Sequence, residues 1–242
     1  MTQSENGAVE SAEHIPAWGT GTGAKLLFAI AVAFSVFQLW TSAYSPLPSQ
    51  VVRSIHVGFL LLLLFGLYAN ASTVTAQRAT FWFAAIVSFV LSLYHWIFYE
   101  DLVIRAGEPN TLDIVIGILV VALVFWAGKK MMGWTLPLIC AIFLAYGLFG
   151  QYLPHPFNHR GYDFAQVIEV LFLGTEGIYG TPIYVSSSYI FLFILFGAFL
   201  ERAGMIQLFN DIAMGTVGAS RGGPAKVSVI SSALMGTING SG

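Results

Sequence analysis

The sequence predicts an all-α integral membrane protein with about six transmembrane helices, interfacial helices and the start of a re-entrant hairpin. The first observation is composition: 57% of the 242 residues are hydrophobic and 9% are charged, whereas soluble proteins carry roughly a quarter of charged residues. The second is the presence of apolar runs that approach the roughly 20 residues a helix needs to cross a bilayer. The third is a final segment in which glycine and serine interrupt an apolar helix, as occurs where membrane-buried backbone lines a cavity.

Six apolar runs are predicted to cross the membrane, and polar, glycine or proline residues separate them. None of the separating segments has the length or composition of a soluble domain. Residues 1–23 are polar and acidic, which is the wrong charge for a cleaved signal peptide, and we expect a disordered cytoplasmic tail. The predicted spans are residues 24–43, 51–68, 80–99, 111–127, 134–152 and 184–200.

Shorter helices are expected near the last span. Residues 163–173 alternate polar and apolar faces at helical spacing, which predicts an interfacial helix. Residues 174–182 contain too much glycine to continue that helix, and we expect a turn there. Residues 207–217 are too short to span and are interpreted as a helix lying along the cytoplasmic interface.

The distribution of lysine and arginine predicts the orientation, because cytoplasmic loops retain these residues. Lys129 and Lys130 mark one loop as cytoplasmic, and alternating the spans places most other basic residues on the same side. Arg53, Arg105 and Arg160 remain outside, where the third connection is acidic. The prediction is therefore a cytoplasmic N-terminus.

Several function classes are disfavoured. A net charge of −2 without basic clusters gives no surface for nucleic acid, and one cysteine permits no internal disulfide. His155 and His159 lie near acidic residues but lack metalloprotease spacing, and we expect no metal site there. His95, at the end of the third span, is interpreted as an interfacial histidine rather than a proton relay. No nucleophile with a base and an oxyanion hole is recognisable, so an intramembrane enzyme is disfavoured, and no cofactor is expected.

The segment 222–242 has the strongest functional signal. A short apolar run carries Ser231 and Ser232 and then breaks at Asn239, Gly240 and Ser241. A half-helix that ends inside the membrane presents carbonyl groups and its negative dipole end, which suit a small cation such as sodium. The alternative is a face of small residues that packs against another helix.

These residues also resemble a known family. The run GGPAKVSVISSALMGTINGS at 222–241 is similar to the first hairpin signature of the large membrane subunit of tripartite ATP-independent periplasmic (TRAP) transporters. The sequences FGAFLERAG at 196–204 and GTEGIYGTPI at 174–183 strengthen the resemblance. The four earlier spans occupy the place of the small membrane subunit, fused in one chain as in the TAXI-type subgroup.

The resemblance implies a domain division and a mechanism. Residues 24–130 would form a four-helix scaffold domain like the small subunit, and residues 131–242 the N-terminal part of the transport domain. It implies a permease of a bacterial or archaeal inner membrane, in which sodium drives uptake of an organic anion, a carboxylate, by an elevator-type movement. An extracytoplasmic binding protein would deliver the substrate.

The resemblance also implies the site residues. Asn239, Gly240 and Ser241 would coordinate sodium at the hairpin tip, with Ser231 and Ser232 as weaker candidates on its arm. The family's large subunit continues through further helices and a second hairpin, so we expect a truncated transport domain here. The alternative function is a non-transporting membrane scaffold, or a remnant, that binds a partner subunit. A channel ranks last, because no symmetric pore-lining repeat is found.

Overall fold

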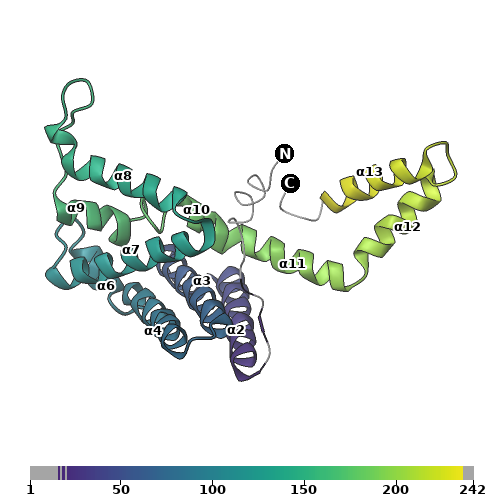
Figure 1. Ribbon diagram of the computed structural model, residues 1–242, viewed down its shortest axis with the longest axis horizontal. Coiled ribbons are helices and arrows are strands. Elements are labelled where there is room, and N and C mark those ends of the chain that lie inside the picture. Colours follow the sequence, from purple (N-terminus) through teal and green to yellow (C-terminus); the bar gives the residue numbers. More distant parts are fainter. Residues whose placement is uncertain (1–15, 17, 20, 237–242) are drawn as a thin grey trace. The chain divides into compact units, whose positions relative to one another are not determined.

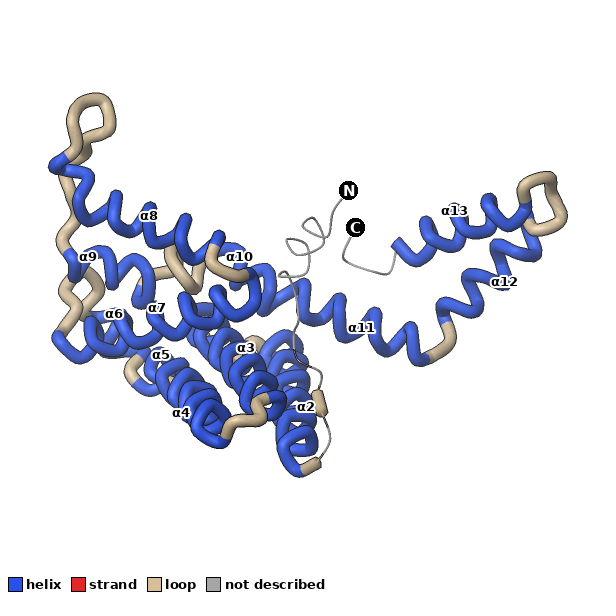
Figure 2. The backbone as a smooth tube through the Cα atoms, in the orientation of Figure 1, coloured by secondary structure: helices blue, strands red, loops and turns tan. Residues whose placement is uncertain are grey.

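The computed structural model describes residues 16, 18, 19 and 21–236, and in this part of the chain every regular element is helical (Figures 1 and 2). Most elements are α-helices, η1 is a 3₁₀-helix, and η2 and η3 are π-helices. The elements in order are α2 (Thr22–Tyr44), α3 (Ser49–Ala71), α4 (Thr75–Ser92), α5 (Tyr94–Ile97), α6 (Tyr99–Ile104), α7 (Thr111–Met132), α8 (Thr135–Phe149), η1 (Gly150–Tyr152), α9 (Phe164–Ile168), η2 (Glu169–Leu173), α10 (Thr181–Val185), η3 (Ser186–Ile190), α11 (Phe191–Arg202), α12 (Met205–Val217) and α13 (Gly223–Gly236).

Six helical stretches of the described chain are long and apolar enough to cross a membrane, which confirms the predicted number of spans. Three of them combine consecutive elements: the third runs from α4 into α5, the fifth runs from α8 into η1, and the sixth runs from α10 through η3 into α11. The expected helix at 163–173 is present as α9 and η2, and the one at 207–217 is present as α12. The protein is therefore an all-α, multi-pass membrane protein.

Two local sequence features set the ends of α7. Asn110 and Asp113 form a reciprocal capping box that satisfies backbone N–H groups at its start. Lys129 and Lys130 occupy its last turn, where their positive charges interact favourably with the negative end of the helix dipole. Gly133 comes next with a φ of 72°, a left-handed conformation that glycine adopts at little cost.

The chain divides into two compact units. The first contains Met1–Phe34 and Ser45–Tyr184, and the second contains Ser35–Tyr44 and Val185–Gly242. These units reflect internal packing, and they do not test the division at residue 130 that the resemblance implies.

The core of the first unit lies where α3 and α4 pack side by side and α7 joins them. Phe65, Phe81 and Trp126 form an aromatic cluster with ring centroids 5.0 to 6.5 Å apart. Gly58 allows a close approach, because a Cβ atom there would overlap Ser92 Oγ. Close packing at small residues is what holds helices together in lipid, where the hydrophobic effect is absent.

The second unit contains a helical hairpin. Helices α12 and α13 run antiparallel and are joined by residues 218–222 (Figure 1). Gly204 precedes α12 with a φ of 86°, and Gly222 precedes α13 with a φ of 73°. Glycine at both positions permits the left-handed backbone that separates one helix from the next.

Candidate functional site

The predicted hairpin arm is helix α13, and a buried serine joins it to α12. Ser231 is 8% exposed, and its hydroxyl donates a hydrogen bond to Asn210 Oδ1. Ser232, the next residue, is exposed. The two weaker site candidates therefore differ: one is committed to the interhelical contact, and the other faces away from it.

The predicted hairpin tip lies outside the described residues. Asn239, Gly240 and Ser241 come after the last described residue, Gly236. Their assignment as sodium ligands stays a prediction. What the structure adds is the antiparallel pair that leads to them, in which α13 is packed along α12.

The first unit has a second feature, which the sequence analysis did not identify: side chains of α3 bind the backbone of residues 173–179. Gln50 donates from Nε2 to the carbonyl oxygen of Leu173, the last residue of the π-helix η2. Arg53 donates from Nη1 to the carbonyl oxygen of Tyr179 at 2.8 Å, and its guanidinium lies 4.6 Å from the centre of the Tyr184 ring. These contacts fasten the glycine-rich turn to α3.

The turn itself is folded tightly against η2. The N–H of Ile178 donates to the carbonyl oxygen of Leu171 at 2.8 Å. A Cβ atom on Gly177 would overlap the Cα atom of Leu171, so only glycine fits at this position. The turn expected at 174–182 is thus confirmed for residues 174–180, α10 begins already at Thr181, and the backbone geometry of the turn depends on close packing.

His95 lies beneath the same turn. Its side chain is fully buried, with Nδ1 3.4 Å from Ser54 Oγ and edge-to-face ring contacts to Phe172 and Tyr179 at 4.7 and 4.9 Å. The sequence analysis placed His95 at the end of a span and did not predict this burial. The covering rings come from residues far along the chain, which explains why the burial was not predicted.

Tyr179 closes this cluster. It is fully buried, and burial raises the pKa of its phenol to about 12, with the Ser54 hydroxyl acting in the opposite direction. The phenol therefore stays protonated at neutral pH. A protonated phenol among aromatic rings is suited to packing and not to proton transfer.

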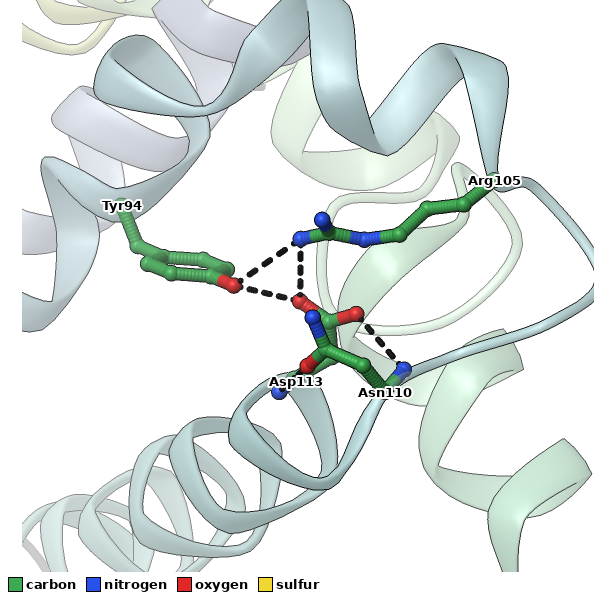
Figure 3. Close-up of polar contacts among 4 residues, drawn as sticks. All are labelled: Tyr94, Arg105, Asn110 and Asp113. Atoms are coloured by element: carbon green, nitrogen blue, oxygen red, sulfur yellow. Dashed lines mark hydrogen bonds and ion pairs between the residues drawn. The ribbon is translucent and has the colours of Figure 1, made fainter.

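An ion pair between Arg105, which follows α6, and Asp113, in the first turn of α7, lies between the third and fourth spans (Figure 3). Asp113 Oδ1 accepts from Arg105 Nη2 at 2.8 Å and from the hydroxyl of Tyr94, and Asp113 Oδ2 accepts from the N–H of Asn110 at 2.9 Å. Only 1% of the Asp113 side chain is exposed. Because the carboxylate is satisfied by three neighbours, it ties the loop to the two spans and is not a free ligand.

The hydrogen bond to Asp113 raises the pKa of the Arg105 guanidinium above its ordinary value. Arg105 also lines a cavity of about 220 Å³ together with Gln50 and Glu169. Glu169 Oε1 accepts a hydrogen bond from the N–H of Gly107 at 2.6 Å, so this carboxylate holds the loop before α7.

The described residues offer no cluster of three His, Cys, Asp or Glu side chains that could hold a metal ion. His159, considered above with His155, lies against the Tyr146 ring at 4.9 Å and hydrogen-bonds its own loop.

In the second unit, Gln38 of α2 reaches a π-helix. The side chain is fully buried and donates from Nε2 to the carbonyl oxygen of Ser187 in η3. Sequence analysis missed this contact because nothing in the local pattern distinguishes Ser186–Ile190 from an ordinary helical turn.

Comparison with known proteins gives one family. Residues 119–242, just over half of the chain, match the family model described as tripartite ATP-independent periplasmic transporter, DctM component. No curated protein and no solved structure gives a significant match. The matched region contains the glycine-rich turn, the sixth span and the α12–α13 hairpin.

Proposed function

This chain belongs to the DctM component family of tripartite ATP-independent periplasmic transporters, and on that premise we propose that it is the membrane permease component of a sodium-driven secondary transporter. Its substrate is an organic anion, a carboxylate, which an extracytoplasmic binding protein delivers. The permease lies in a bacterial or archaeal inner membrane with its N-terminus in the cytoplasm. The carrier part moves like an elevator against a scaffold built by the four N-terminal spans.

The α12–α13 hairpin is the observation that carries this proposal. It lies inside the family match and leads to Asn239, Gly240 and Ser241. Amide, hydroxyl and backbone oxygens are the ligands that a hard cation prefers, and the negative end of a half-helix adds to their attraction. We assign sodium to these three residues, with Ser232 as the arm residue whose hydroxyl remains exposed.

The charge distribution supports the proposed orientation. Lys129 and Lys130 lie in the last turn of α7, at the end of the fourth span, and the Lys129 ammonium is 3.9 Å from the Trp134 ring centre. Basic residues beside aromatic residues at the end of a span are typical of the cytoplasmic interface. The exposed Trp96 and the acidic Glu100 and Asp101 line one pocket near the connection between the third and fourth spans. Lys129 and Lys130 are at the other end of the fourth span, so this pocket would face the outside, where a delivering protein would dock.

The test uses the full-length protein in liposomes, together with candidate binding proteins and a panel of radiolabelled monocarboxylates and dicarboxylates. An inward sodium gradient should drive uptake, and potassium should not replace sodium. Asn239→Ala and Ser241→Ala should each lower the apparent sodium affinity at least tenfold. Ser228→Ala, at an exposed position of α13, should leave it unchanged.

Two results would overturn parts of the proposal separately. Uptake with unchanged sodium dependence in both tip variants would sink the site assignment but keep the transport function. Binding of radioactive sodium to the wild-type protein without uptake of any carboxylate would favour the non-transporting scaffold.

A further inference from the structure

A buried glutamine contacts an irregular turn of the sixth span. Gln38 is fully buried within the apolar helix α2, and its amide nitrogen donates to the carbonyl oxygen of Ser187. Ser187 is itself 3% exposed. Burying an amide in a transmembrane helix costs free energy unless the amide is hydrogen-bonded. The bond to Ser187 therefore offsets the cost of burying Gln38, and we ask what else this bond does.

The partner belongs to a π-helix. Residues Ser186–Ile190 interrupt an otherwise α-helical span, Thr181–Arg202, and Pro182 lies too early in the helix to cause the interruption. A π-helix bonds residue i to i+5 and so accommodates one residue more than an α-turn. One extra residue rotates the helix beyond it by about 100°, since an α-helix has about 3.6 residues per turn.

This rotation is transmitted to the helices after η3. Helix α11 begins directly after η3, and α12 and α13 come after α11 along the chain. The side chains that α11 directs outward, such as Phe193, Ile194 and Phe199, are fixed by the register in which η3 ends. A contact that stabilises the π-helix therefore sets the face that α11 presents.

We infer that Gln38 is a positioning residue: its hydrogen bond to Ser187 holds Ser186–Ile190 as a π-helix and thereby fixes the rotational register of α11. The hydrogen-bond donor is the group that acts, because Oε1 of Gln38 has no partner among the described residues. This role requires neither sodium, nor a carboxylate, nor transport.

Substitutions at residue 38 separate the hydrogen bond from packing. Gln38→Met keeps the length of the side chain and removes the donor. Gln38→Glu keeps a donor, because a carboxyl group buried without a cation stays protonated and its O–H replaces the amide N–H. Gln207→Met, at an exposed position on α12, is the matched control.

The readout is the lipid exposure of α11. A nitroxide label is placed at each position from 191 to 200 of the full-length protein in liposomes, and its accessibility to oxygen is measured by electron paramagnetic resonance. The wild type, Gln38→Glu and Gln207→Met should share one pattern, with maxima at the exposed positions. Gln38→Met should shift the pattern by one residue, the equivalent of about 100°.

Deleting Ser188 completes the test. The deletion removes the extra residue, so the combination of Gln38→Met with this deletion should restore the wild-type pattern through a continuous α-helix. An unshifted pattern in Gln38→Met, or a shift in Gln38→Glu as large as in Gln38→Met, would overturn the inference. If Gln38→Met does not fold, the combined variant decides: recovery with the wild-type pattern supports the inference, and failure to recover contradicts it.

Discussion

Asp113 and Arg105 form an ion pair of 2.8 Å in which the carboxylate is almost completely buried and the guanidinium is about one quarter exposed. The pair connects the start of α7 to the loop after α6, and the hydroxyl of Tyr94 links the same carboxylate to the end of the third span. A buried carboxylate of this kind is favourable only while all its partners are present.

Asp113→Ala should therefore destabilise the protein by roughly 2 to 4 kcal/mol, because it removes one half of the capping box and leaves the hydroxyl of Tyr94 and the guanidinium of Arg105 without their acceptor. Thermal unfolding of the detergent-solubilised protein measures the effect. Glu100→Gln, at an exposed acidic position before the same loop, is the control and should change the unfolding temperature little. Equal effects of the two substitutions would contradict the assigned role.

The contacts of Arg53 with the turn should require an arginine and not just a positive charge. Arg53→Lys keeps the charge but cannot both donate to the carbonyl oxygen of Tyr179 and stack on Tyr184, so the turn at 174–180 should loosen by about 1 to 2 kcal/mol. Faster hydrogen exchange of the backbone N–H of Ile178 is the measurement. Arg78→Lys, at an exposed position, is the control. Unchanged exchange in Arg53→Lys would show that the contact does not hold the turn.

The capping box at Asp113 and the contacts of Arg53 differ in how far they can be predicted from the sequence. The six spans follow from composition and length, because the bilayer imposes both. The capping box also has a local signature, Asn110 with Asp113 three residues later. That spacing alone is enough to predict the cap.

Arg53 and Tyr179 have no such signature. They are separated by 126 positions in the chain, and the arginine recognises a backbone carbonyl group, which leaves no trace in the identity of its partner residue. The two π-helices are invisible for a related reason, since the sequences of Glu169–Leu173 and Ser186–Ile190 are compatible with an α-helix. Tertiary packing selects the wider turn.

The buried phenol of Tyr179 predicts an alkaline loss of stability. Its folded-state pKa is about 12 and its ordinary value is 10.0, so between these values the unfolded chain releases the proton first. Stability is therefore fully present below pH 10 and falls as the pH rises toward 12. Unfolding temperatures of the wild type and Tyr179→Phe should converge as the pH rises through this window. Parallel curves would mean that the phenol is not buried as described.

Gly117 is predicted to be a point of close helix packing. A Cβ atom there would lie 2.5 Å from Ile168 Cγ2 and 3.2 Å from the Phe172 ring, so Gly117→Ala should cost about 1 to 3 kcal/mol through overpacking of α7 against α9 and η2. Gly147 is also helical, but no atom lies within 4 Å of the position that a Cβ atom would take there. Gly147→Ala should thus be neutral or slightly stabilising. Unfolding temperatures in one detergent compare them directly.

The hairpin offers the last test, because adjacent serines differ in environment. Ser231 donates to Asn210 Oδ1 across the α12–α13 pair, whereas Ser232 is exposed. Ser231→Ala should weaken the pair by about 1 kcal/mol, a typical value for an interhelical hydrogen bond in a membrane protein. Hydrogen exchange of α13 should rise about fivefold in Ser231→Ala and stay unchanged in Ser232→Ala.

The same pair of variants separates stability from ion binding. If Ser231 acts only through Asn210, Asn210→Ala should raise exchange as much as Ser231→Ala, and the double variant should add little to either. A further loss of sodium affinity in Ser231→Ala that Asn210→Ala does not reproduce would instead assign the Ser231 oxygen to the ion. Helix α13, the arm of the predicted re-entrant hairpin, would then contribute to sodium binding in addition to the proposed tip residues.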